Sequence, residues 1–166
     1  LPNRRLFNDR LGQAVKRAQR TSSSLALRFV DLDKFKPIND TYGHEAGDFM
    51  LQTVAKRLSG CLRASDTAAR VGGDEFLVLL PDIPSGADAL AVAEKIRSAL
   101  AEPCISPEGI ELCISASIGI AIYPEHAGSE HELLRLGDRA MYEAKSAGGN
   151  RVKLFSPEDG AGSSAA

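Results

Sequence analysis

Apolar residues recur every three or four positions in four long stretches of the chain and gather in five shorter runs, which predicts four amphipathic helices and five strands. The helices are expected at residues 3–20, 45–62, 85–101 and 130–147, with a short helical turn at 35–39. The strands are expected at residues 25–30, 68–71, 76–80, 114–123 and 151–155. In the strand at 114–123 bulky residues alternate with small ones, so one of its faces is small. Because the order combines a hairpin with crossover helices, the predicted fold is an α/β (α+β) sandwich, a mixed central sheet with flanking helices.

Composition narrows the class of protein. With 166 residues, 43% apolar and 25% charged, the chain fits one globular domain, expected at residues 1–156, followed by a flexible tail at 157–166. A formal charge of −2 lacks the basic surplus of a protein that binds a nucleic acid polymer. Three cysteines without C-x-x-C spacing indicate a reducing cytoplasm. No apolar run approaches the ~20 residues of a spanning helix, so we expect no membrane segment in this fragment, although a longer parent protein could be membrane-anchored.

Two acidic segments are candidates for metal chemistry. Asp31 and Asp33 end a buried strand two positions apart, so their side chains share a face. Such a pair can cap a helix or be solvated, or it can bind Mg²⁺, which prefers oxygen ligands. The Gly-Gly-Asp-Glu segment at 72–75 can likewise be an ordinary hairpin turn in which glycine supplies a positive φ. If the two strands are neighbours, Asp31 and Asp74 can share divalent ions, which predicts phosphoryl or nucleotidyl transfer.

Several motifs, in order along the chain, resemble those of the GGDEF domain of the diguanylate cyclase family, and the resemblance covers residues 1 to about 155. The motifs are Leu1-Pro2-Asn3-Arg4-Arg5, the run from Asp31 to Asp48, Arg70-Val71 before Gly72-Gly73-Asp74-Glu75-Phe76, Ser117-Ile118-Gly119-Ile120-Ala121, and Ala144-Lys145 with Gly148 and Asn150. The family joins two GTP molecules into cyclic di-GMP, a bacterial second messenger, and releases pyrophosphate. Its fold is similar to the palm domain of nucleotidyl cyclases and polymerases.

The resemblance implies a metal site. By position, Asp31 and Asp74 would hold Mg²⁺ or Mn²⁺ together with the backbone carbonyl of Leu32. Glu75 would help to bind the metal or to activate the 3′-hydroxyl of the substrate.

It also implies a site for GTP. Asn39 and Asp48 match the positions that read guanine, whose N1 and N2 donors and O6 acceptor suit an Asp and an Asn. Adenine would leave these groups unpaired, a mismatch that can reject an analogue by ~10⁴–10⁵. Without the resemblance, Asn39 is equally well explained as a helix C-cap and Asp48 as a first-turn dipole partner. Gly72 and Gly73 would let the polyphosphate approach the backbone.

Phosphate contacts are expected from several basic or N–H groups. Lys36 and Lys145 match phosphate-contacting positions, and backbone N–H groups near Lys34 and Phe35 could cradle the β- and γ-phosphates. Either lysine could equally be an ordinary solvated side chain. His44 is a candidate nucleotide contact, or a helix-start residue bonded to the backbone.

Arg63 and Asp66 form an R-x-x-D at the offset from Gly72 where the family binds its product as an inhibitor. The arginine fork suits a phosphate or a guanine edge, and a surface ion pair is the alternative reading. The sequence departs from the family pattern at Gly149, where an Arg often follows the glycine that ends the last helix. This departure weakens one expected phosphate contact.

Since one domain holds one GTP, forming two linkages requires two facing domains, so a homodimer is expected for catalysis. We expect the chain to be cut from a longer signalling protein, because it begins at Leu1 and lacks the D-x-L-T-G that usually precedes the Leu-Pro-Asn-Arg-Arg run in the family. The alternative function is a catalytically silent GTP- or cyclic di-GMP-binding module of a tandem GGDEF-EAL protein. A third reading, a related palm-type cyclase with another product, is disfavoured by Asn39 and Asp48.

Overall fold

The structure is a computed structural model, and it describes residues 2–157. Its helices are α1 (Arg4–Thr21), α2 (Phe35–Tyr42), α3 (His44–Gly60), α4 (Gly86–Leu100) and α5 (Glu130–Ser146). Its strands are β1 (Leu25–Asp33), β2 (Thr67–Arg70), β3 (Glu75–Leu80), β4 (Cys104–Ile105), β5 (Glu111–Leu112), β6 (Ser115–Tyr123) and β7 (Arg151–Leu154). The tail predicted at 157–166 lies outside the described residues except for its first position. Within residues 2–157, no helix is both long and apolar enough to cross a membrane.

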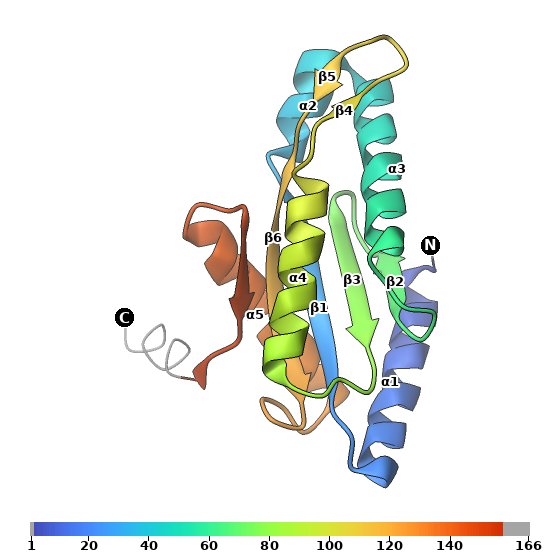
Figure 1. Ribbon diagram of the computed structural model, residues 1–166, viewed down its shortest axis with the longest axis vertical. Coiled ribbons are helices and arrows are strands. Elements are labelled where there is room, and N and C mark those ends of the chain that lie inside the picture. The colour runs from blue at the N-terminus through green and yellow to red at the C-terminus, as the bar shows by residue number, and fades with distance from the viewer. Residues whose placement is uncertain (1, 158–166) are drawn as a thin grey trace.

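A mixed sheet forms the centre of the domain, with the strand order β2-β3-β1-β6-β7. β6 and β7 are parallel, and the other neighbours in the sheet are antiparallel. α3 and α4 pack on one face of this sheet, and α1 and α5 pack on the other (Figure 1). β1 and β6 are buried along almost their whole length because helices cover both faces. The predicted sandwich is therefore confirmed.

Each predicted helix and strand is present, with two differences in detail. β1 runs on to Asp33, so that both aspartates belong to the strand itself. A small hairpin, β4 paired with β5, has no counterpart in the prediction. Each of its strands has two residues, which is too short for an apolar run or an alternation to indicate a strand.

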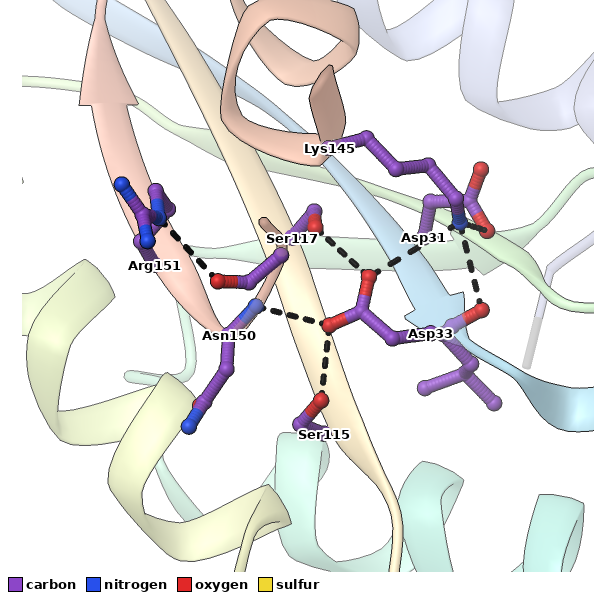
Figure 2. A network of polar contacts seen from close by, with 9 residues as sticks. Asp31, Asp33, Ser115, Ser117, Lys145, Asn150 and Arg151 are labelled. Atoms are coloured by element: carbon purple, nitrogen blue, oxygen red, sulfur yellow. Dashed lines mark hydrogen bonds and ion pairs between the residues drawn. The ribbon is translucent and has the colours of Figure 1, made fainter. Parts of the chain in front are cut away.

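Close packing of α5 on β6 explains why one face of that strand is small. A Cβ atom on Gly119 would lie 2.1 Å from the backbone nitrogen of Met141 and 2.5 Å from the carbonyl oxygen of Gly137. Glycine at this point of β6 therefore lets the two backbones approach each other. The last turn of α5, which carries Lys145, consequently lies over the end of β1 (Figure 2).

Candidate active site

The end of β1 and the turn between β2 and β3 lie side by side. Asp31 stands opposite Glu75 in the antiparallel β1–β3 ladder. The backbone N–H of Leu32 donates to the carbonyl oxygen of Asp74 over 3.1 Å. The condition set by the sequence, that these strands are neighbours, is met, and three candidate acidic residues come together.

The β2–β3 turn is held by a residue to which sequence reasoning assigned no role. Arg70 Nε donates to the carbonyl oxygen of Gly72 over 3.1 Å, and Arg70 Nη2 donates to that of Gly73 over 2.9 Å. Neither glycine has a φ in the left-handed region, so the ordinary explanation of a positive-φ turn is wrong. A Cβ atom on Gly73 would have no atom within 4 Å, which leaves the backbone there open to a ligand.

Lys145 reaches the two aspartates of β1 from the last turn of α5 (Figure 2). Its Nζ lies 2.9 Å from Asp31 Oδ1 and 3.8 Å from Asp33 Oδ1. The same ammonium donates to the carbonyl oxygen of Leu32 over 3.3 Å. The lysine side chain is about one-third exposed, whereas both aspartate side chains are largely covered.

Asp33 is held by donors from β6 and from the turn before β7. Ser117 Oγ donates to Asp33 Oδ1 over 2.6 Å, while Ser115 Oγ donates to Asp33 Oδ2 over 2.7 Å. The backbone N–H of Asn150 adds a third hydrogen bond to Oδ2, over 2.8 Å (Figure 2). Both oxygens of Asp33 are therefore already engaged, so this residue positions the cluster, and Asp31 is the better candidate metal ligand.

Gly149 packs directly on the same carboxylate. It has a φ of +74°, and a Cβ atom there would lie 2.9 Å from the carboxyl carbon and both oxygens of Asp33. An Arg at this position, as the family often has, would need a left-handed backbone and a shift of Asp33. At Gly149 the backbone thus packs against the Asp33 carboxylate with no room for a side chain.

Two carboxylates of the cluster, those of Asp31 and Glu75, are harder to ionise than in water. Burial raises the pKa of Asp31 above its ordinary value, and the charges of Asp74 and Asp33 act in the same direction against the pull of Lys145. Burial also raises the pKa of Glu75, and the nearby charges of Asp31, Asp138 and Asp74 add to the effect. A cation placed among these groups would relieve both costs.

The donor set fits a divalent cation of the magnesium type. Asp31 Oδ1 is buried and, among the described residues, its partner is a cation, the Lys145 ammonium at 2.9 Å, rather than a hydrogen-bond donor of good geometry. Carboxylates and backbone carbonyls are the oxygen ligands that Mg²⁺ prefers, usually one or two carboxylates with substrate phosphates. Within the described residues, no three His, Cys, Asp or Glu side chains are arranged to hold a metal by themselves.

Of the two candidate guanine readers, Asn39 packs against Gly47, the residue that precedes Asp48 on α3. A Cβ atom on Gly47 would lie 1.7 Å from Asn39 Oδ1, so the Asn39 amide occupies the space that a side chain on α3 would fill. Asp48 follows Gly47 directly and borders an open groove of about 490 Å³. Gln52 and Arg70 also line this groove, which joins it to the β2–β3 turn.

The candidate phosphate groups lie around the start of α2. Lys34, the N-cap of α2, has a left-handed φ of 55° and makes no side-chain capping bond to the helix. The first N–H groups of α2 are thus left without a side-chain acceptor. Phe35 is buried beneath this turn, while Lys36 and His44, the latter at the start of α3, are exposed.

Arg63 and Asp66 form a bonded pair at the end of α3. Arg63 Nη2 lies 3.0 Å from Asp66 Oδ1, and the backbone N–H of Arg63 donates to Asp66 Oδ2 over 2.8 Å. Arg63 Nη2 also donates to the carbonyl oxygen of Pro81 over 2.9 Å. Both residues line a separate hollow of about 150 Å³, together with Asp88. The arginine is half exposed, which leaves it open to a ligand.

A mixed sheet with carboxylates at the end of β1 and in the adjacent hairpin, beside an open groove, defines a palm-like domain of the nucleotidyl cyclase class. The family model described as "Diguanylate cyclase, GGDEF domain" matches residues 1–151. The chain belongs to this family, which confirms the resemblance seen in the sequence.

Curated relatives are similar over most of the chain. Diguanylate cyclase TpbB of Pseudomonas aeruginosa is 48% identical over 145 residues, which are 87% of this chain and 33% of TpbB. The bifunctional diguanylate cyclase/cyclic di-GMP phosphodiesterase MucR of the same species is 49% identical over 156 residues, 93% of this chain and 22% of MucR. The chain thus spans a third or less of these relatives.

Solved structures share the fold. The crystal structure of the GGDEF domain of TpbB superposes with a TM-score of 0.92 at 46% identity, covering 94% of this chain and 97% of that one. The GGDEF domain of DgcB from Caulobacter crescentus, solved in complex with c-di-GMP, has a TM-score of 0.86 at 31% identity, covering 93% and 89%.

Proposed function

We propose that residues 1–156 form a diguanylate cyclase domain that condenses two GTP molecules into cyclic di-GMP and releases pyrophosphate. The observation that carries this proposal is the convergence of Asp31, Asp74 and Glu75 from two neighbouring strands, beside a groove bordered by Asp48. The names of the relatives TpbB and MucR, both diguanylate cyclases, support the same reaction.

Asp31, the carbonyl of Leu32 and Asp74 would hold Mg²⁺ or Mn²⁺, with Glu75 beside them. When bound, such an ion lowers the pKa of an attacking hydroxyl and neutralises a leaving pyrophosphate. The remaining contacts to the nucleotide come from other residues of the domain. Asn39 and Asp48 hydrogen-bond the guanine edge and exclude adenine.

The phosphates extend from this groove toward the start of α2. There the uncapped N–H groups of the first turn and the exposed Lys36 meet negative charge. His44, at the start of α3, contacts the nucleotide from the other side of the α2–α3 junction, and Gly72 and Gly73 leave room at the hairpin. Glu75, whose pKa burial raises, would accept a proton from the 3′-hydroxyl.

One domain with one such site holds one GTP, so two domains must face each other to make both linkages. We infer a catalytic homodimer in which each 3′-hydroxyl attacks the α-phosphate held by the partner. The Arg63–Asp66 hollow would bind cyclic di-GMP as a feedback inhibitor, since a half-exposed guanidinium and a carboxylate suit phosphate and guanine N–H groups.

The test is product analysis on the chain fused to a dimerising segment. With GTP and Mg²⁺, we expect cyclic di-GMP and pyrophosphate in a 1:2 ratio by chromatography. Asp74→Ala should abolish both products while the far-UV circular dichroism stays unchanged. Asp9→Ala, which removes an exposed carboxylate from α1, is the matched control and should keep full activity. Intact GTP from the folded, dimerised protein would reject the proposal.

A second candidate is a silent regulatory module in a tandem GGDEF-EAL protein. It is favoured by the similarity to NbdA of Pseudomonas aeruginosa, a relative named only as a cyclic di-GMP phosphodiesterase, which is 36% identical over 156 residues. This function predicts that the dimerised chain binds GTP or cyclic di-GMP but leaves GTP intact.

A further inference from the structure

The Lys145 ammonium contacts two of the oxygen atoms that are proposed above as metal ligands. Nζ is 2.9 Å from Asp31 Oδ1 and 3.3 Å from the carbonyl oxygen of Leu32 (Figure 2). These oxygens come from adjacent residues at the end of β1 and point to the same cation. The contact therefore involves the proposed metal ligands themselves.

An ammonium and a divalent cation compete for these oxygens. Mg²⁺ requires oxygen ligands at about 2.0–2.1 Å in a near-octahedral shell, and two cations sharing one carboxylate oxygen would repel each other strongly. Asp31 Oδ1 is buried, so little solvent is available to screen that repulsion.

We propose that Lys145 is an internal counter-ion that fills the divalent-cation position in the nucleotide-free domain, and that cation binding displaces its ammonium. The freed ammonium is then available to the phosphates of the incoming nucleotide. This second step rests on the proposed function.

The surroundings allow Lys145 to leave without disturbing the rest of the cluster. Asp33 keeps hydrogen bonds from Ser117, Ser115 and the backbone of Asn150, and the ammonium is 3.8 Å from it. Asp31, by contrast, has a buried oxygen without such donors. The lysine stem is flexible and about one-third exposed, so its head has a path to solvent. Exchange of cations thus changes the partner of Asp31 and of the Leu32 carbonyl, while Asp33 keeps its three hydrogen-bond donors.

Removing the Lys145 ammonium should strengthen the binding of a divalent cation at Asp31. In Lys145→Gln the charge of Asp31 loses its neighbouring cation, and no internal ion competes for this carboxylate. A lysine with a merely structural role would have the opposite effect, since its loss would loosen the site and weaken metal binding.

The experiment measures Mn²⁺ binding by electron paramagnetic resonance without nucleotide. We expect Lys145→Gln to bind Mn²⁺ several-fold more tightly than the unmodified chain, and Lys95→Gln, which removes an exposed lysine from α4, to match the unmodified chain. Unchanged or weaker binding in Lys145→Gln would overturn the inference.

A second measurement needs no variant. Acetylation of lysines by a limited dose of an amine reagent, read by mass spectrometry, should rise several-fold at Lys145 when Mg²⁺ is added, and stay constant at Lys95. Equal labelling of Lys145 with and without Mg²⁺ would contradict displacement.

These outcomes separate the inference from the proposed function. If Mn²⁺ binds both forms equally and GTP is still converted, the counter-ion role is wrong and the cyclase stands. If no Mn²⁺ binds and GTP stays intact, the proposed function fails, and the inference fails with it.

Discussion

Ser117 stands opposite Asp31 in the β1–β6 ladder, yet its hydroxyl donates to Asp33, over 2.6 Å. This hydrogen bond joins diagonal neighbours on β6 and β1, on the face of the sheet that α5 covers. As a result, the two aspartates of one D-x-D segment have different surroundings. Asp33 is satisfied by hydrogen bonds of the protein itself, while Asp31 faces a cation.

Ser117→Ala tests this division of roles. The substitution removes the hydroxyl of the fully buried Ser117 and leaves the largely covered Asp33 with one donor fewer, so the free energy of unfolding should fall by about 1–2 kcal/mol. Because Asp33 would then turn toward Lys145 and Asp31, cyclic di-GMP formation should also fall. Urea unfolding and product assays measure both effects. Ser98→Ala, on the exposed side of α4, should change neither, and a Ser117→Ala protein indistinguishable from it would refute the role of this hydrogen bond.

Gly47→Ala tests the guanine groove. The new methyl would occupy the place of the Asn39 amide, 1.7 Å from Oδ1, and would push that flexible side chain away without opening the core. We expect the KM for GTP to rise by about tenfold or more, as expected when a hydrogen bond to the base is lost, with a normal thermal transition. Gly60→Ala on the same helix is the control, since a Cβ there has no atom within 4 Å. Equal KM values for the two variants would remove Asn39 from base recognition.

Arg28→Met should stabilise the protein. Arg28 is fully buried on β1, and its Nε and Nη1 have no hydrogen-bond partners among residues 2–157, although Nη2 donates to the carbonyl oxygen of Ala89 over 2.8 Å. Burial lowers its pKa to about 10. An apolar side chain of similar length would remove the unsatisfied donors, raising the free energy of unfolding by about 1–3 kcal/mol. A lower denaturation midpoint in Arg28→Met would show that the buried guanidinium is net stabilising.

The free energy of unfolding should decline as the pH falls through the range in which histidine titrates. His126 Nδ1 accepts a hydrogen bond from the backbone N–H of Ile122 over 2.9 Å, and burial lowers the pKa of His126 below 6.5, against a weaker opposing effect of Glu125. The folded chain therefore binds fewer protons here than the unfolded chain, so this contribution is complete above about pH 6.5 and is lost at lower pH. His126→Asn keeps an acceptor that does not titrate. Its free energy of unfolding should vary less between about pH 7 and about pH 5 than that of the unmodified chain, and parallel curves would exclude His126 as the cause.

Arg63→Ala should relieve product inhibition. The substitution removes the half-exposed guanidinium from the Arg63–Asp66 hollow, so added cyclic di-GMP should inhibit at least about tenfold less effectively, as expected for the loss of a charge-assisted contact. The initial rate without product should remain unchanged, because this hollow is separate from the groove at Asp48. Undiminished inhibition would assign the R-x-x-D to a surface ion pair.

Much of this arrangement follows from local sequence. The apolar runs around Asp31 and Glu75 predict two strands, and their pairing is the one additional fact that joins the acidic residues. Contacts between distant segments could not be predicted. Ser117 is 84 positions from Asp33, and no local pattern connects them.

The glycines illustrate a second limit of sequence reasoning. Gly47 has its role because of where the Asn39 side chain lies, which depends on the packing of α2 against α3. Gly72 and Gly73 suggest a turn with positive φ, but the turn is held by Arg70 instead. In both cases the residue type is visible in the sequence, while its physical reason is a tertiary contact.

The most direct test of the account is a crystal structure of the chain with Mn²⁺ and a non-hydrolysable GTP analogue. Anomalous scattering should place manganese in contact with Asp31 and the carbonyl of Leu32, with Lys145 withdrawn from Asp31 and guanine beside Asn39 and Asp48. Manganese bound elsewhere, with Asp31 still paired to Lys145 and no base in the groove, would contradict it.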